Sequence, residues 1–330
     1  KVTVKYKDLL KDIAERTNNV EFFYDNIKNN NRWENNRLHT HTSVFMSDIN
    51  IEDFYRFKFN DTYPLSDNLI LTKSYLDIEV DGIDAKSDFP ELGECPINAV
   101  TLIDGTSNKV YTLLLKNDKN PLIEDFISRL KDKPNEFFNK LKDTISYAVG
   151  GHKNVLRYGL DKLDFQLQFY DDELQLIHDL FILINNSKVD FVLAWNMAFD
   201  IPYIIERLKK LRVNPESVMC HEDFKYKEVY YYVDEFRKNE FAERGDFARI
   251  SSYSVFLDQM IHFASRRKGQ SAIRSYRLDY IGQVIANVKK LDYSHITTEI
   301  KELPYKDYDT FVIYNIIDTI VQKCIELKTD

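Results

Sequence analysis

The sequence predicts a layered α/β fold, in which helices pack against a β-sheet. Three strand-like segments follow one another between about residues 69 and 116 and are joined by short polar turns. From about residue 121 onward, segments with the helical period alternate with shorter strand-like segments. Hydrophobic residues make up 44% of the 330 residues and aromatic residues 14%, which is ample material for a folded core and argues against wholesale disorder.

The individual elements are read from hydrophobic period and turn residues. Strands are expected within 69–80, at 98–104 and at 109–116, and the turn sequence DGTSN between the last two makes the group a meander. The later elements are expected as a helical region at 121–147, a strand at 165–170, a helix at about 172–186, a strand at 190–195 and a helix at about 200–211.

Two unequal parts are expected. Residues 1–69 combine a helix at 7–16 with an asparagine-rich run that ends at residue 36, and they are interpreted as a small N-terminal α+β region. Residues 70–330 form the larger domain. Within it, KYKEVYYYVDEF and FARISSYSVF are expected to pair as an inserted β-hairpin at about 224–253, after which helices carry the chain to residue 330.

Bulk properties exclude several classes of protein. Cys95, Cys220 and Cys324 are scattered and form no C-x-x-C pair, which argues against a disulfide framework or a zinc site and favours a reducing compartment. No stretch approaches the ~20 apolar residues of a membrane span, so a cytoplasmic protein without a membrane partner is expected. The net charge of −8 counts against a protein that simply coats phosphates, although catalytic carboxylates with bound metal ions would invert that argument locally.

The first candidate site is the pair Asp77 and Glu79. Because they stand two apart on an expected strand, both side chains emerge from one face and can share a cation. The pair alone is weak evidence, since 53 acidic residues produce roughly eight such pairs by chance, and a solvated strand face is the ordinary alternative. Their apolar neighbours Leu76, Ile78 and Val80 nevertheless place them at the end of a sheet interior, where unpaired carboxylates are costly.

Two other interpretations of LDIEVDG fail. An EF-hand loop requires Glu at its twelfth position, where this sequence has Asp88, and a helix where a strand is expected. An aspartyl-phosphate phosphatase requires a second Asp where Glu79 stands.

Two further candidates lie later in the chain. A buried strand is followed by Asn196, Phe199 and Asp200 at the start of an amphipathic helix. Helix capping would explain Asp200 alone. The combination of the three residues, however, lies at the carboxyl end of a strand, where α/β sheets carry their sites. Tyr314 and Asp318 stand four apart on the very apolar helix FVIYNIIDTIVQKCIEL, and a structural salt bridge is the ordinary alternative there.

Together these segments resemble the Exo I, Exo II and Exo III motifs of family B DNA polymerases, with patterns D-x-E, N-x(2 or 3)-F/Y-D and Y-x-x-x-D. They read DIE at 77–79, NMAFD at 196–200 and YNIID at 314–318, in the family's order. SYRLDYIGQ also resembles the family's Y-S-L-D-Y-I segment. The resemblance spans about residues 70–330.

The resemblance implies a ribonuclease H-like fold, a mixed sheet flanked by helices, and a 3′-5′ exonuclease that removes misinserted nucleotides from a primer end. It implies two divalent metal ions held by Asp77, Glu79, Asp200 and Asp318. Four carboxylates without a nearby histidine or cysteine suit Mg²⁺ or Mn²⁺.

The resemblance also implies roles for residues around the carboxylates. The superfamily's histidine-dependent branch has a histidine where Ile313 stands, so Tyr314 is expected to orient the attacking water. In KLDY, Lys290 is the candidate for contacting the scissile phosphate, with Lys289 adjacent. Residues expected to bind single-stranded DNA are Asn196, Phe199 and Arg277, the last standing where the family has a serine. A cluster of basic residues has two equally good interpretations, a basic track for single-stranded DNA and a solvated helix face. Its members are Arg266, Arg267, Lys268, Arg274 and Arg277.

The polymerase motifs D-x-x-S-L-Y-P-S, K-x-x-x-N-S-x-Y-G and Y-x-D-T-D-S are missing from this sequence. A polymerase domain or a separate polymerase subunit is therefore an expected partner. The chain is interpreted as a piece of a longer polymerase, half of a split polymerase or a free-standing nuclease, of bacteriophage origin. Two other functions stay open, a non-catalytic DNA-holding module and an RNA exonuclease of the same superfamily; intact carboxylates argue against the first and the tyrosine form against the second.

Overall fold

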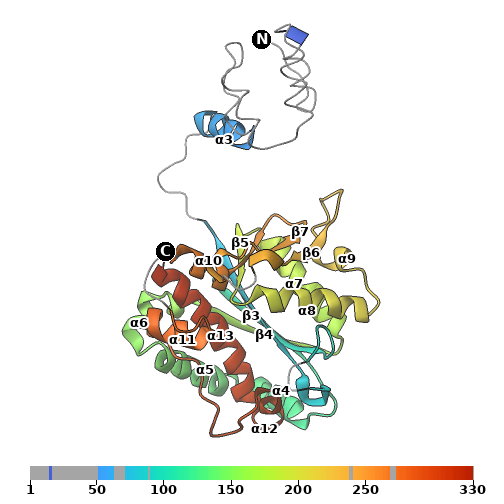
Figure 1. The fold of residues 1–330 in the computed structure, drawn as a ribbon. Coiled ribbons are helices and arrows are strands. Elements are labelled where there is room, and N and C mark those ends of the chain that lie inside the picture. Colours follow the sequence, from blue (N-terminus) through green and yellow to red (C-terminus); the bar gives the residue numbers. More distant parts are fainter. Residues whose placement is uncertain are drawn as a thin grey trace. The chain divides into compact units, whose positions relative to one another are not determined.

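The computed structural model describes residues 15–16, 51–62, 71–87, 90–237, 241–267 and 273–329. The chain divides into two compact units, Lys1–Ile70 and Leu71–Asp330 (Figure 1). In the first unit the described residues include the helix α3, Ile51–Thr62. Most of the helix expected at 7–16, and the whole asparagine-rich run, lie outside the described residues.

The second unit is built on a six-stranded sheet with the order β4-β3-β2-β1-β5-β8. The pairs β1–β2 and β2–β3 are antiparallel, whereas β3–β4, β1–β5 and β5–β8 are parallel. This confirms the expected mixed sheet with helices on its faces, as a ribonuclease H-like fold requires. The strands are β1 Lys73–Val80, β2 Ile97–Ile103, β3 Lys109–Leu115, β4 Asp164–Tyr170, β5 Phe191–Ala194 and β8 Val255–Asp258.

The meander β1–β2–β3 forms where the turn residues predict it. Asp104 caps the turn between β2 and β3, because its carboxylate accepts hydrogen bonds from the backbone and hydroxyl of Thr106 and from the hydroxyl of Ser107. Gly105 is required there, since a Cβ atom would lie 2.0 Å from the carbonyl oxygen of Lys73.

Helices cover both faces of the sheet and bury two separate cores. One core includes Tyr75 of β1 and the apolar residues of α4, α5 and α13, while the other includes Leu76 of β1 and those of α7 and α8 (Figure 1). Because side chains alternate along a strand, Asp77 and Glu79 share the face of Tyr75, beneath α13. The helices are α4 Pro121–Asp132, α5 Pro134–Ala148, α6 His152–Arg157, α7 Glu173–Ser187, α8 Met197–Lys210, α9 Pro215–Met219, α10 Gln259–Arg266, α11 Leu278–Ile281, α12 Leu303–Lys306 and α13 Tyr308–Thr329.

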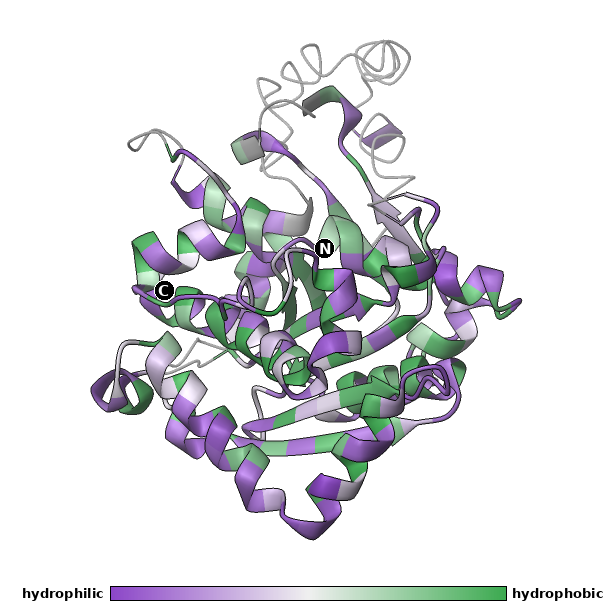
Figure 2. Ribbon diagram, turned by 90° about the horizontal axis from the view of Figure 1, so that it is seen from below, coloured by the Kyte–Doolittle hydropathy of each residue, from purple (hydrophilic) through white to green (hydrophobic). Residues whose placement is uncertain are grey.

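Hydrophilic and hydrophobic residues alternate along the outer helices (Figure 2), as expected of helices with one face toward a core. Short 3-10 turns occupy Gly82–Asp84, Leu160–Lys162, Glu235–Arg237, Phe241–Glu243 and Ile300–Glu302, and a π turn occupies Gly282–Ala286.

Three expectations about elements need correction. The helical region at 121–147 is two helices, because Pro134 keeps Lys133 out of the helical conformation (φ −141°, ψ 61°). The helix expected from about residue 200 begins at Met197, with Asn196 at its N-cap position, so that Asp200 lies inside the first turn.

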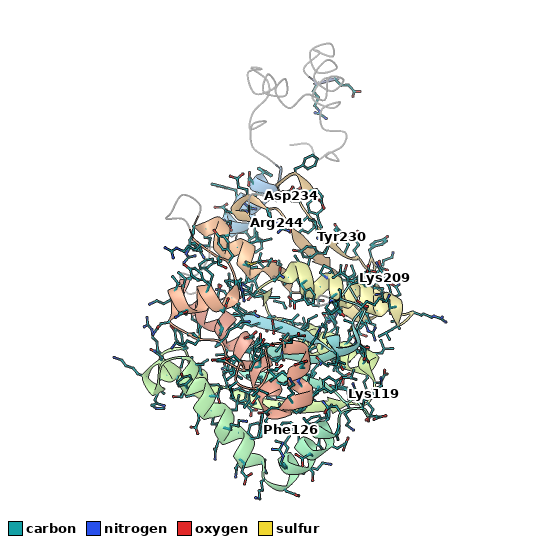
Figure 3. The ribbon with its side chains drawn as sticks, turned by 60° about the horizontal axis from the view of Figure 1, so that its bottom comes forward. Lys119, Phe126, Lys209, Tyr230, Asp234 and Arg244 are labelled. Carbon is teal, nitrogen blue, oxygen red and sulfur yellow. The ribbon has the colours of Figure 1, made fainter. Side chains whose placement is uncertain are left out.

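The expected hairpin is shorter than the segments assigned to it. Strands β6 Val229–Tyr232 and β7 Phe247–Ile250 pair antiparallel, but Val255 and Phe256 of the second segment belong to β8 of the main sheet. Beyond β6 and β7 the two arms stay joined, because Asp234 accepts a hydrogen bond from the backbone of Gly245 (3.2 Å) near Arg244 (Figure 3).

Candidate active site

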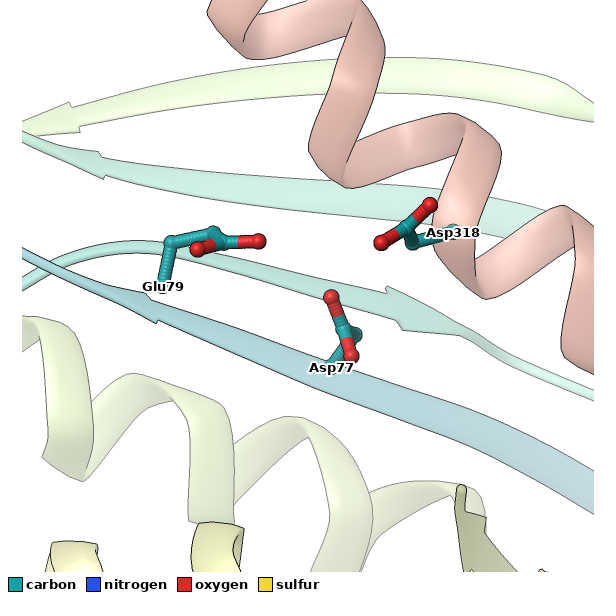
Figure 4. Close-up of side chains that lie close together, drawn as sticks. All are labelled: Asp77, Glu79 and Asp318. Atoms are coloured by element: carbon teal, nitrogen blue, oxygen red, sulfur yellow. The ribbon is translucent and has the colours of Figure 1, made fainter. Parts of the chain in front are cut away.

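Three carboxylates converge where α13 crosses β1. Asp77, Glu79 and Asp318 each offer an oxygen, and these oxygens lie within 4.8 Å of one another (Figure 4). The strand period sends Asp77 and Glu79 to the same side, and α13 packs on β1 and β2 with Asp318 facing them. The arrangement joins residues more than 230 positions apart in the sequence into one acidic cluster.

Lys290 provides a positive charge beside this cluster. Its Nζ donates to Asp318 Oδ2 at 2.5 Å and to the hydroxyl of Tyr314 at 3.4 Å. The ion pair that was the ordinary alternative for Asp318 is therefore present. The other oxygen of Asp318, Oδ1, is buried and has no hydrogen-bond partner among the described residues.

Burial raises the pKa values of all three acids, and the charge of Asp318 raises those of Asp77 and Glu79 further. Burial raises the pKa of Asp77 well above its ordinary 3.8, and the negative charges of Asp318 and Glu79 raise it further. Burial, followed by the charge of Asp318, raises the pKa of Glu79 from 4.5 to about 8. Burial also raises the pKa of Asp318, even though the ammonium of Lys290 lowers it. Among the residues that the structure describes, Lys290 is the cation that lowers the pKa values of these three acids, and its one charge leaves an excess of negative charge that a cation would relieve.

Asp200 lies beside the cluster and is not one of its three members. It is buried in the first turn of α8, and its charge raises the pKa values of Asp77 and Glu79. Burial and the charge of Asp258 raise the pKa of Asp200 itself to about 8, against hydrogen bonds from the backbone of Ile78 and its own residue. The structure therefore gathers three of the four expected carboxylates tightly and brings the fourth within electrostatic reach.

Tyr314 occupies the same face of α13, four residues before Asp318. Its ring packs edge-on against Tyr293, with ring centroids 5.4 Å apart. Burial, followed by the charge of Asp318, raises its pKa, so the hydroxyl keeps its proton and can both donate and accept hydrogen bonds.

A family model described as "DNA polymerase family B, exonuclease domain" matches residues 76–281, which is more than half of the chain. The chain belongs to this family. It is also 24% identical, over 288 residues, to a DNA-directed DNA polymerase of Escherichia phage RB69, an overlap of 83% of this chain and 28% of that polymerase. The chain thus spans little more than a quarter of the length of this relative. Asp77, Glu79 and Asp200 lie inside the matched residues, whereas Lys290, Tyr314 and Asp318 follow them and join the site through the fold.

In this family B exonuclease domain, the residues expected to bind DNA lie in different settings. Asn196 is exposed, whereas Phe199 is half-buried and packs against Tyr203 with ring centroids 5.2 Å apart. Arg277 is exposed near Asp279, 3.4 Å from its carboxylate. Of the basic cluster, Lys268 lies outside the described residues and Arg267 packs over the ring of Phe263.

Sequence reasoning missed Asp258, a buried acid at the carboxyl end of β8. Its Oδ1 accepts from the backbone of Ile261 at 2.9 Å, which caps α10, and its Oδ2 accepts from the backbone of Ala198 at 3.4 Å. The sequence signal for Asp258 is an acid directly after a buried strand. It was missed because the residues of β8 were assigned to the hairpin. Sequence reasoning also missed Asn315 and Gln322 of α13, whose side-chain amides both donate to Asp77.

Among the described residues, none of the helices is at once long and apolar enough to span a lipid bilayer.

Proposed function

We propose that this chain is a 3′-5′ exodeoxyribonuclease that hydrolyses the terminal phosphodiester of single-stranded or mispaired primer ends, with two divalent metal ions. The observation that carries the proposal is the cluster formed by the half-buried acids Asp77 and Glu79 and the buried acid Asp318 within a family B exonuclease domain. Its partners would be the primer 3′ end and a polymerase domain or subunit, inside the host cell.

The residues fit hard divalent ions. Carboxylate oxygens, with no histidine or cysteine in the cluster, are the ligands that Mg²⁺ and Mn²⁺ prefer. The unpartnered Oδ1 of Asp318 is a buried acceptor that a cation would satisfy. Asp77, Glu79 and Asp318 are the residues that would hold the ions, with Asp200 beside them as the fourth carboxylate. Divalent ions in such a site lower the pKa of water and neutralise the charge that develops on a leaving oxygen.

The neighbouring polar side chains suit the remaining tasks. Tyr314 keeps its hydroxyl proton, so it can accept a hydrogen bond from the attacking water while donating another, which fixes the direction of attack. The ammonium of Lys290 has three N–H donors, and its contacts with described residues, to Asp318 and Tyr314, occupy two of them. The third would contact a non-bridging oxygen of the scissile phosphate.

The 3′ end of the DNA strand would reach the carboxylates by passing the start of α8. Asn196 is exposed there and offers an amide to a phosphate or base, and Phe199 would lie against the last nucleotide. Arg277 is exposed and would attract the phosphates upstream. The β6–β7 hairpin would help to keep the primer end apart from its template strand.

The test is degradation of 3′-labelled single-stranded DNA in Mg²⁺ or Mn²⁺. We expect shortening from the 3′ end, its loss with chelator, and its loss in Asp77→Ala and Asp318→Ala. Asp132→Ala, an exposed acid at the end of α4, is the matched control and should cleave normally. Full activity in Asp77→Ala would contradict the proposal, as would faster cleavage of RNA than of DNA, and a protein that binds DNA without cleaving it would be a holding module.

A further inference from the structure

A row of polar side chains crosses the sheet beneath α13 at the level of Asp77. Asp77 of β1 pairs in register with Thr101 of β2, which pairs in register with Thr112 of β3. Paired residues of adjacent strands present their side chains on the same face, so the three lie in one line under the helix. Both threonines are fully buried in an otherwise apolar core, where a hydroxyl without a partner is costly.

Asn315 of α13 connects this row to the carboxylate. Its Nδ2 donates to Asp77 Oδ2 at 3.2 Å, and its Oδ1 accepts from Thr101 Oγ1 at 2.5 Å. The NH₂ group of Asn315 faces Asp77 and its carbonyl oxygen faces Thr101, which is the orientation that an ionised, cation-binding Asp77 requires, since a carboxylate can only accept. The proton of Thr101 is then committed to Asn315, and Thr112 is the donor in the contact between the two hydroxyls at 3.2 Å.

Gln322 contacts the other oxygen of Asp77. Its Nε2 lies 3.5 Å from Asp77 Oδ1 and 3.3 Å from the carbonyl oxygen of Leu76. Asn315 and Gln322 stand seven apart on α13, with Asp318 between them, so all three side chains share one face of the helix. The helix thus presents one carboxylate to the cluster and two fully buried amides to the back of Asp77.

The amides oppose the repulsion inside the cluster. The negative charges of Asp318 and Glu79 act on Asp77 and, without a cation, would drive its carboxylate away from them. Donors on the opposite side hold it in place, and Thr101 prevents the amide of Asn315 from turning its oxygen toward the carboxylate. We propose that Asn315, Gln322 and Thr101 are positioning residues that pre-orient Asp77 and so set the affinity of the site for divalent cations. The inference rests on the proposed function for its activity readout, but not for its binding readout.

Isosteric variants separate positioning from simple core packing. Thr101→Val keeps the shape of the side chain and removes the proton that orients Asn315, whereas Thr101→Ser keeps the proton. Thr112→Val removes a hydroxyl from the same buried row and leaves the donation of Thr101 to Asn315 intact, so it is the matched control. Asn315→Leu removes the amide itself and serves as a second variant.

The measurement is Mn²⁺ affinity by calorimetry, together with thermal unfolding in chelator and the Mg²⁺ dependence of exonuclease rate. We expect Thr101→Val and Asn315→Leu to weaken Mn²⁺ binding about 10-fold, the lower end of the effect of residues that orient metal ligands. Thr101→Ser and Thr112→Val should bind as the wild type does. The half-saturating Mg²⁺ concentration should rise in Thr101→Val, while KM for DNA stays constant.

The outcomes distinguish the two proposals. If Thr101→Val folds and binds Mn²⁺ as tightly as the wild type, or if Thr112→Val weakens binding equally, the positioning role is wrong even though the nuclease proposal stands. If the wild type binds Mn²⁺ and cleaves no DNA, the proposed function is wrong. The order of Mn²⁺ affinities among the four variants would still show whether the positioning role is right.

Discussion

Glu79 is the residue whose pKa has the clearest consequence for stability. Burial and the charge of Asp318 raise its pKa from 4.5 to about 8 in the metal-free protein, so the folded state binds this proton more tightly than the unfolded state does. The resulting stabilisation is complete below about pH 4.5 and is lost as pH rises through about 8. We therefore expect the Tm of the metal-free protein to fall between pH 5 and pH 8.5 relative to Glu79→Gln, which carries no titrating group there.

The measurement is thermal unfolding of both proteins in chelator across that pH range. Asp200→Asn should behave similarly, because burial and the charge of Asp258 raise the pKa of Asp200 to about 8 as well. Parallel Tm curves for the wild type and Glu79→Gln would show that Glu79 is not protonated in the folded protein at neutral pH.

Lys290 and Lys289 offer a sharp comparison of neighbours. Lys290 pairs with Asp318 inside the site, whereas Lys289 is exposed. We expect Lys290→Ala to lower the kcat for single-stranded DNA by about 10²-fold, the usual effect of removing one group that stabilises transition-state charge. Lys289→Ala should stay within about 2-fold of the wild type, far below the loss expected when a group that stabilises transition-state charge is removed. The check is single-turnover cleavage at saturating Mg²⁺, and an equal loss in both variants would assign the effect to the general charge of this segment.

At the scale of elements, α8 is fixed to the sheet by a buried ion pair. Arg207 of α8 donates to both carboxylate oxygens of Glu173 on α7, at 2.7 to 3.0 Å, and the same carboxylate accepts from the backbone of Ile97 at the start of β2. The guanidinium also contacts the carbonyl oxygens of Gly93 and Glu94. One side chain thus joins two helices and a loop, and it holds the helix that carries Asp200.

Removing one partner of this pair should be strongly destabilising. Arg207→Ala leaves Glu173 buried with its charge uncompensated, and we expect it to lower the free energy of unfolding by about 3–5 kcal/mol. Lys209→Ala, which breaks an exposed pair with Glu206 on the same helix, should cost less than about 1 kcal/mol (Figure 3). Urea unfolding of the two variants tests the difference, and similar midpoints would mean that the buried pair contributes no more than a surface one.

The elements with a strong local pattern could be predicted from the sequence, and those defined by long-range packing could not. The meander, α7 and α13 have clear apolar periods and distinctive turn or cap residues. β8 has four residues. Its pattern of apolar residues fits a strand of the hairpin as well as a strand parallel to β5, where it lies. The choice depends on an association with β5 that no local sequence pattern encodes.

The same division holds for the site. Asp77, Glu79 and Asp318 could be selected because an acid in an apolar segment requires a partner. Asp200 could be selected because it follows a buried strand together with Asn196 and Phe199. The roles of all four remain predictions. The roles of Asn315, Gln322 and Thr101 could not be read, because an amide or hydroxyl in a helix or strand shows its partner only after α13 has packed across the sheet. The separation of Asp200 from the other three acids is likewise a property of the packed fold.

At the scale of the whole molecule, cation binding and folding should be coupled. The acidic cluster is assembled from β1 and α13, residues 77 to 318, so it exists only in the folded chain. A cation that binds the folded state alone stabilises it by about 2.7 kcal/mol at a concentration 100 times its Kd. Because the raised pKa values make protons compete with the cation, the stabilisation should be larger at pH 8 than at pH 6. We expect Mn²⁺ to raise the Tm of the wild type and of Asp132→Ala but not of Asp77→Ala, as measured by calorimetry, and an equal rise in Asp77→Ala would mean that the cation binds outside the cluster.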